Sequence, residues 1–97
     1  MAIIVTFDIP GATQAMYEEA ADRLSGGRGL ESLADWPAQG LIAHITGPSP
    51  TGWFVTDVWE SEEAFQRFGE VLMPVLRAVG YPEFPALVLP AHKVVLS

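Results

Sequence analysis

Two side chains in the middle of the chain are suited to proton transfer. His44 interrupts the apolar run Leu-Ile-Ala-His-Ile, and Asp57 lies within Val-Thr-Asp-Val-Trp. A neutral imidazole can take a proton from a phenol or from a carbon beside a carbonyl. A carboxylate on a buried strand must be paired or hydrogen-bonded. We therefore predict that His44 is a base and that Asp57 orients it or carries a second proton; the alternative is a buried histidine satisfied by backbone or water.

The pairing of the two strands that carry these residues decides whether they meet. If Thr46 lies opposite Trp53, and His44 opposite Val55, then His44 and Asp57 lie diagonally on one face of the sheet. A slip by one residue would separate them, because successive side chains point to opposite faces. The sequence leaves this register open.

Other residues could bind a ligand beside this pair. Aromatic side chains give flat apolar walls, although they also pack in cores and dimer interfaces; the candidates are Trp36, Trp53 and Trp59. A hydroxyl could donate a hydrogen bond to the ligand, from Thr46 or Thr56. His92 follows the last strand and could reach the same cavity.

Two further expectations concern cofactors and the tyrosines. His44, Asp57 and His92 are separated by 13 and 35 residues, which matches no spacing of metal ligands, so we expect no metal site. The proton-transfer chemistry expected of His44 and Asp57 also needs no organic cofactor, and we expect none. Tyr17 and Tyr81 could donate to an oxyanion, but packing is the favoured role for both.

Composition limits the classes of protein. The chain has 97 residues, a formal net charge of −7 and no cysteine, which predicts one domain over residues 1–97 in a reducing compartment. The negative charge disfavours nucleic acid and anionic membranes as partners. Residues 36–56 lack Asp, Glu, Lys and Arg, but their prolines and glycines forbid a membrane-spanning helix. The first residues do not resemble a signal peptide, so we expect a cytoplasmic location.

The spacing of apolar and turn residues predicts six regular elements. Strands are expected at residues 2–7, 40–47 and 53–59, with a last extended segment at a sheet edge because it contains Pro90. Helices are expected at residues 14–24, capped by Thr13, and from the cap Ser61 to residue 79. Pro74 should bend or interrupt the second helix. The connection 25–39 is long, and its Leu30, Leu33 and Trp36 predict a short helical turn over a pocket.

This order, βαββαβ, predicts an α+β ferredoxin-like fold with a four-stranded antiparallel sheet. Both helices would lie on one face of the sheet. The other face does not read as polar, so it needs an apolar partner. A second copy of the chain would cover it, which predicts a homodimer.

One segment has a more specific resemblance. The run GWFVTDVWESEEAFQRF, together with MAIIVTFDIPG and LPAHKVVLS, resembles dimeric α/β-barrel proteins of the antibiotic biosynthesis monooxygenase type. The resemblance implies that two sheets pack face to face around a pocket used for cofactor-free oxygenation of phenolic or polyketide substrates, haem degradation or ring closure. Haem degradation usually places a histidine on a barrel helix, and residues 61–79 contain none.

The functional expectation joins these observations. We expect a homodimer that binds a small apolar or aromatic molecule and acts as a cofactor-independent monooxygenase or cyclase. The alternative is a non-catalytic ligand-binding or structural dimer, in which His44 and Asp57 only satisfy each other.

Overall fold

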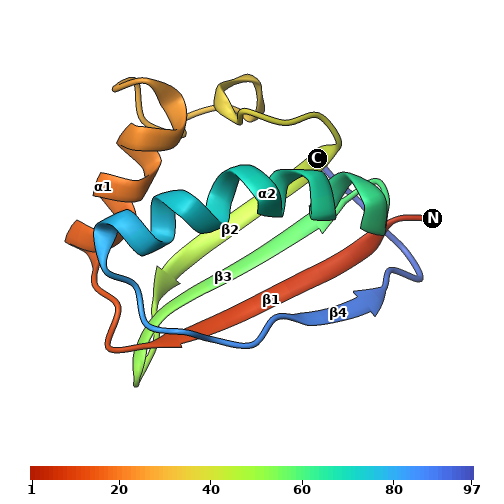
Figure 1. The fold of residues 1–97 in the computed structure, drawn as a ribbon. Helices are drawn as coiled ribbons and strands as arrows, with labels where there is room; N and C mark the ends of the chain where they lie inside the picture. Colours follow the sequence, from red (N-terminus) through yellow and green to blue (C-terminus); the bar gives the residue numbers. More distant parts are fainter.

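The chain folds into one antiparallel sheet with two helices on one side (Figure 1). The computed structural model describes residues 1–97. The strands pair in the order β2-β3-β1-β4, which confirms the ferredoxin-like α+β fold and the βαββαβ order. Neither helix is long and apolar enough to cross a membrane. The elements are β1 (Ile3–Pro10), α1 (Gln14–Ser25), the 3₁₀ turn η1 (Leu33–Asp35), β2 (Leu41–Pro48), β3 (Gly52–Trp59), α2 (Glu62–Val79) and β4 (Leu87–Pro90).

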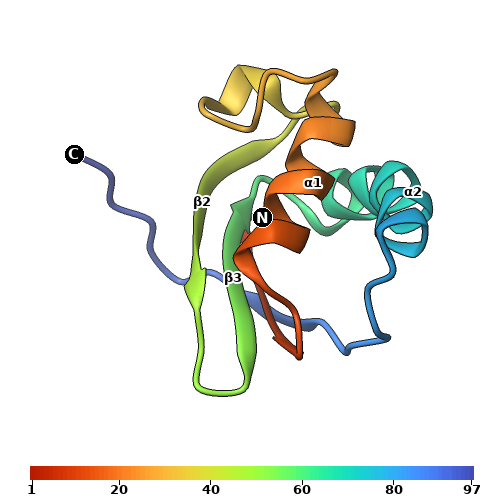
Figure 2. The same cartoon turned by 90° about the vertical axis from the view of Figure 1, so that its left-hand side faces the viewer.

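The core lies between the sheet and the two helices (Figure 2). Alternate residues of β1 and β3 point into it, and Val5 and Trp59 are fully enclosed. The other face of β1 is only half-buried at Ile4 and Thr6 and exposed at Asp8. In the single chain, no further layer covers the outer face of this strand.

Both helices begin and end at the predicted signals. The N-terminal caps are Thr13, whose hydroxyl oxygen accepts the Met16 N–H at 3.2 Å, and Ser61, whose oxygen accepts the Ala64 N–H at 3.1 Å. Gly26 and Gly80 follow the helices in the left-handed conformation that glycine adopts without steric cost. The capping residues therefore set where each helix meets the sheet.

Pro74 does not interrupt α2, which is continuous from Glu62 to Val79. The expected interruption is wrong because the missing bond costs little at this place. Pro74 and Glu70 are both exposed, so the Glu70 carbonyl can bond to water instead of an amide. The residues of the opposite face, such as Phe68 and Leu76, hold both halves of the helix against the sheet.

The outer face of the sheet is apolar and uncovered. Ile45 of the edge strand β2 is 66% exposed, with Phe54, Leu87 and Leu89 also exposed. After β4 the chain runs away from the body as an extended tail (Figure 2). The single chain thus leaves bare the face that the sequence predicts to need a partner.

Candidate active site

His44 and Asp57 face each other directly across the pair β2 and β3. They are opposite residues in the ladder, and His44 Nδ1 lies 2.5 Å from Asp57 Oδ1. Thr46 lies opposite Val55 rather than Trp53, so the observed register differs from the diagonal arrangement by two residues. The pairing runs in one register from the hairpin turn to Ala43 and shifts only between Leu41 and Ala43, beyond His44. The hairpin therefore sets the register that places His44 opposite Asp57, and both side chains line the cavity on the helix side.

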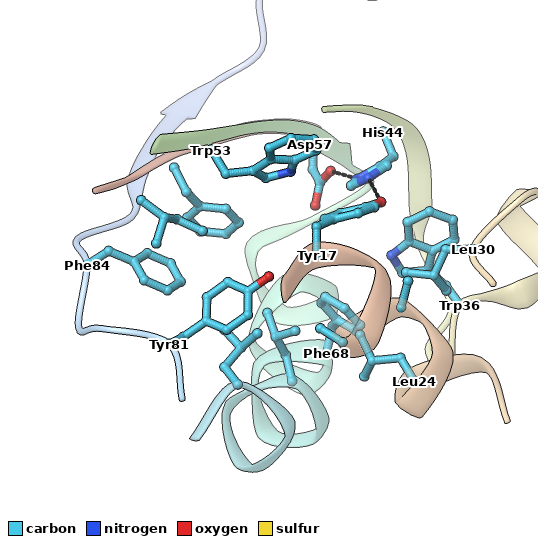
Figure 3. Close-up of a pocket in the computed structure, with 16 residues that line it drawn as sticks. Tyr17, Leu24, Leu30, Trp36, His44, Trp53, Asp57, Phe68, Tyr81 and Phe84 are labelled. Carbon is cyan, nitrogen blue, oxygen red and sulfur yellow. Dashed lines mark hydrogen bonds and ion pairs between the residues drawn. The ribbon is translucent and has the colours of Figure 1, made fainter. Parts of the chain in front are cut away.

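Tyr17 completes the group from α1. Its hydroxyl oxygen lies 2.7 Å from His44 Nε2 (Figure 3). The favoured expectation for Tyr17 was packing, and this hydrogen bond was missed. Tyr17 shares a helix face with Ala20, Ala21 and Leu24, and all four line one cavity. This stripe of residues was the signal that could have placed Tyr17 on the buried side.

The hydrogen-bonded chain continues behind Asp57. Trp59 Nε1 donates to Asp57 Oδ2 at 3.3 Å, so both carboxylate oxygens accept a hydrogen bond. Asp57 is only 2% exposed, and a carboxylate buried to this extent needs such partners. Trp59 is held in turn by stacking on Phe68, with ring centroids 5.1 Å apart. We call the ordered set Tyr17, His44, Asp57 and Trp59 the relay.

The partners of His44 assign its protons. Asp57 accepts from Nδ1–H, and a neutral imidazole then has its acceptor at Nε2, to which the Tyr17 O–H donates. Burial, and next the negative charge of Asp57, raise the pKa of Tyr17 to about 12. Tyr17 is therefore a neutral phenol at physiological pH. Its oxygen retains lone pairs for a further hydrogen bond.

The relay lies at the wall of an apolar cavity between the sheet and the helices. The cavity has a volume of about 60 Å³, and 14 of its 16 lining residues are hydrophobic. Trp53 and Trp36 are among them, and Trp36 packs on His44 with ring centroids 4.7 Å apart (Figure 3). The resemblance implies a pocket between two sheets. In the chain itself, the cavity with His44 and Asp57 lies instead on the helix side of one sheet.

Four of the predicted binding residues lie outside this cavity. Trp59 is fully buried behind Asp57, where it positions the carboxylate. Thr46 donates its hydroxyl to the Phe54 carbonyl at 2.8 Å, and Thr56 alternates onto the outer face of the sheet beside Ile45. His92 is exposed on the C-terminal tail. In the single chain, none of these four side chains lies where it would contact a ligand in this cavity.

The connection between α1 and β2 covers the cavity as predicted. We call residues 26–40 the roof; Leu30 and Trp36 are its cavity-lining residues, and η1 is its short helical turn. Gly26 has φ of 70° and Gly40 has φ of 105°, a backbone conformation that other residues rarely adopt. These glycines allow the chain to turn sharply at both ends of the roof.

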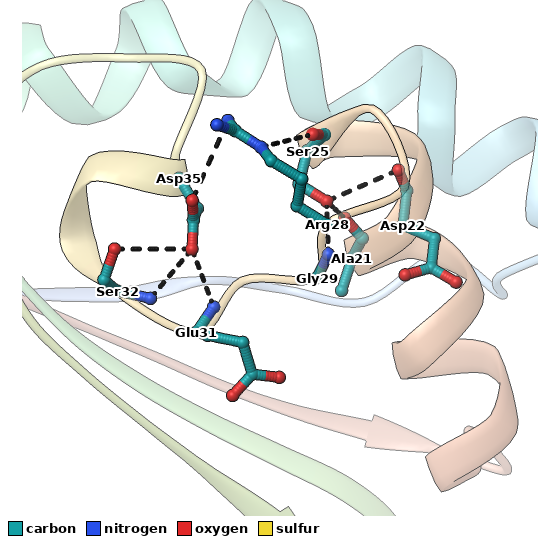
Figure 4. Close-up of polar contacts among 8 residues, drawn as sticks. All are labelled: Ala21, Asp22, Ser25, Arg28, Gly29, Glu31, Ser32 and Asp35. Atoms are coloured by element: carbon teal, nitrogen blue, oxygen red, sulfur yellow. Dashed lines mark hydrogen bonds and ion pairs between the residues drawn. The ribbon is translucent and has the colours of Figure 1, made fainter.

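Polar contacts hold the roof in shape (Figure 4). The Asp35 carboxylate accepts the N–H groups of Ser32 and Glu31 and lies 3.7 Å from the Arg28 guanidinium. The Ser32 N–H contributes most to lowering the pKa of Asp35 below its usual value. At the other end, Ser25 accepts the Gly29 N–H at 2.8 Å. The roof is therefore an ordered cover rather than a loose coil.

The two tyrosines should ionise late in an alkaline titration. Burial raises the pKa of both Tyr17 and Tyr81 to about 12, and the chain has no other tyrosine. Unfolded tyrosines ionise near pH 10. The contribution of the two neutral, buried tyrosines to the stability of the folded state is therefore complete below about pH 10 and is lost as the pH rises from 10 towards 12. Phenolate absorbance should show no ionisation near pH 10 while circular dichroism remains native; ionisation there by a native protein would contradict the burial of one ring.

Comparison with known proteins gives matches at the level of structure. No protein-family model and no curated protein matches the sequence. SnoaB, a cofactor-independent oxygenase from Streptomyces nogalater, aligns over 99% of this chain and 96% of its own with 17% identity, at TM-scores of 0.57 for one structure and 0.59 for a mutant. A monooxygenase from the gene ActVA-Orf6 of Streptomyces coelicolor, in complex with the ligand nanaomycin D, aligns over 99% of this chain and 91% of its own, with 19% identity and a TM-score of 0.54.

These matches confirm the fold expected from the sequence resemblance. The chain has a ferredoxin-like fold, which it shares with these two oxygenases. At such identities the match establishes the architecture and not the chemistry. The chemistry must be argued from the relay and its cavity.

Proposed function

We propose that this protein is a cofactor-independent monooxygenase of a small phenolic or related aromatic compound. The observation that carries the proposal is the hydrogen-bonded series from Tyr17 through His44 to Asp57 at the wall of an otherwise apolar cavity. The oxygenases with the same fold support it. A flat apolar molecule fits the lining, and the relay supplies the one group of the cavity that can accept a proton.

The first step is removal of a proton from the substrate. The acidic O–H or C–H group of the substrate lies against the Tyr17 oxygen. This oxygen accepts the substrate proton while the Tyr17 hydroxyl proton moves to His44 Nε2. The imidazolium then lies beside the Asp57 carboxylate, which stabilises it. The apolar lining keeps water from returning a proton to the substrate anion.

The substrate anion then reacts with dioxygen. For anthrone, the carbanion adds O₂, the peroxide takes the proton held on His44, and loss of water leaves anthraquinone. One oxygen atom enters the product and the other leaves as water, and the substrate supplies all the electrons. The step requires no external reductant.

Anthrone and O₂ provide the direct test. With no added cofactor and with chelator present, we expect oxygen consumption and anthraquinone formation well above the spontaneous rate. Tyr17→Phe should lower this rate while leaving the apolar lining intact. Binding of anthrone without turnover would instead support the non-catalytic ligand-binding dimer.

Access to the cavity requires the roof to move. A volume of about 60 Å³ holds a few water molecules, whereas ligand sites usually have several hundred. Asp35→Ala removes the carboxylate that ties Arg28, Glu31 and Ser32 together. We expect trypsin to cleave faster after Arg28 in this variant, while cleavage after Arg77 in α2 keeps its rate. Equal cleavage after Arg28 in both proteins would show that these contacts do not hold the roof.

The proposed active form is a homodimer joined through the outer face of the sheet. Ile45 on β2 is 66% exposed on that face, so Ile45→Glu should produce a folded monomer. Sedimentation at micromolar concentration should show that the wild-type protein is a dimer. The interface is expected to bury more than about 1,200 Å², as specific protein interfaces do. Val71→Glu, at a position on α2 that is 41% exposed, is the matched control and should remain dimeric. A stable wild-type monomer would contradict the proposal.

A further inference from the structure

A second phenol enters the cavity from the segment after α2. The Tyr81 N–H donates to the Leu76 carbonyl at 3.0 Å, which fixes the backbone at the end of the helix. The side chain lines the cavity, and its hydroxyl points towards the middle of it (Figure 3). The hydroxyl makes no hydrogen bond to any group of the chain, whereas the Tyr17 hydroxyl is bonded to His44. Tyr81 thus presents a free donor to the bound molecule.

The immediate neighbour of Tyr81 in the cavity lining is an aromatic ring. Phe84 lies beside it among the lining residues and packs edge-on against Phe7, with ring centroids 5.3 Å apart. Phenylalanine would fill the position of Tyr81 if packing were the only role of this side chain. The hydroxyl has no partner within the chain and is therefore free to donate to a bound molecule.

A second unpaired donor lines the same cavity. Trp53 is 7% exposed, and its indole N–H is the one buried side-chain polar group without a hydrogen-bond partner. Both carboxylate oxygens of Asp57 already accept a hydrogen bond, from His44 and Trp59. The Tyr81 hydroxyl and the Trp53 N–H are therefore two donors that lack an acceptor within the cavity lining. They favour a ligand that carries an additional acceptor.

We propose that Tyr81 determines substrate specificity by donating a hydrogen bond to a second oxygen of the substrate. This inference rests on the proposed function and adds to it. The substrate is then an aromatic compound with an ionisable group against Tyr17 and an acceptor oxygen across the ring against Tyr81. A compound with the first group alone binds in the same cavity but more weakly and without a fixed orientation.

A pair of matched phenols tests the proposal. Para-methoxyphenol and para-ethylphenol have nearly the same shape and acidity, but only the first has a second oxygen. Calorimetry should show that the wild-type protein binds para-methoxyphenol about fivefold more tightly, the effect of one neutral hydrogen bond. Tyr81→Phe should bind the two phenols equally and should keep the wild-type affinity for para-ethylphenol. Tyr17→Phe should weaken both phenols to the same extent.

The outcomes separate this inference from the function on which it rests. A preference for para-methoxyphenol that persists in Tyr81→Phe would overturn the role of Tyr81 and leave the proposed function standing. Equal weakening of both phenols in Tyr81→Phe would show that Tyr81 is only a wall of the cavity. If the wild-type protein binds neither phenol at millimolar concentration, the proposed function fails together with the inference.

Discussion

His44→Asn should lower the turnover of anthrone by about 10²-fold or more, the effect expected from loss of a general base. Asparagine can occupy the place of His44 opposite Asp57, but it cannot accept the proton that Tyr17 releases. Steady-state oxygen consumption measures this loss. Dimerisation and the affinity for para-ethylphenol should change little, because the apolar lining is preserved.

The second histidine supplies the matched control. His92 is exposed on the C-terminal tail, so His92→Asn should retain wild-type turnover. A His44→Asn protein that is destabilised but keeps full turnover would show that His44 is a packing residue.

Trp59→Ala should lower the free energy of unfolding by about 3–5 kcal/mol, the usual cost of removing a large aromatic side chain from a core. Trp59 is fully enclosed, stacks on Phe68 and donates to the buried Asp57 carboxylate. The substitution therefore leaves a cavity and removes a hydrogen bond from the carboxylate. Urea denaturation followed by circular dichroism measures the change.

Trp59→Phe separates the packing of the ring from its hydrogen bond. Phenylalanine keeps much of the ring contact with Phe68 but cannot donate to Asp57. We expect a smaller loss of stability than for Trp59→Ala, together with a clear fall in turnover, because the carboxylate is less firmly oriented. A loss below about 1 kcal/mol for Trp59→Ala would contradict the central place of this residue in the core.

The elements of the fold were predictable because their signals are local. Thr13, Ser61 and Gly80 act through residues within one helical turn, and the apolar spacing of α2 reflects its own buried face. The uncovered apolar face was also predictable, since the order of elements puts both helices on one side. The interruption expected at Pro74 does not occur, because the cost of a lost helix bond depends on whether the freed carbonyl meets water.

The site was only partly predictable because it depends on long-range placement. His44 and Asp57 stand out as polar residues in apolar strands, but the sequence leaves open the hairpin register that places them opposite each other. Tyr17 meets His44 across 27 positions of the chain, through the packing of α1 on the sheet. The position of the cavity on the helix side depends on the same packing.

The central claim is that the relay takes a proton from a phenolic ligand, and the absorption spectrum of bound para-cyanophenol tests it most directly. At a pH below the ionisation of this phenol in water, the wild-type protein should bind it as the phenolate, since the proton passes through Tyr17 to His44. His44→Asn should bind the neutral phenol instead. A neutral spectrum for the ligand bound to the wild-type protein would contradict the claim.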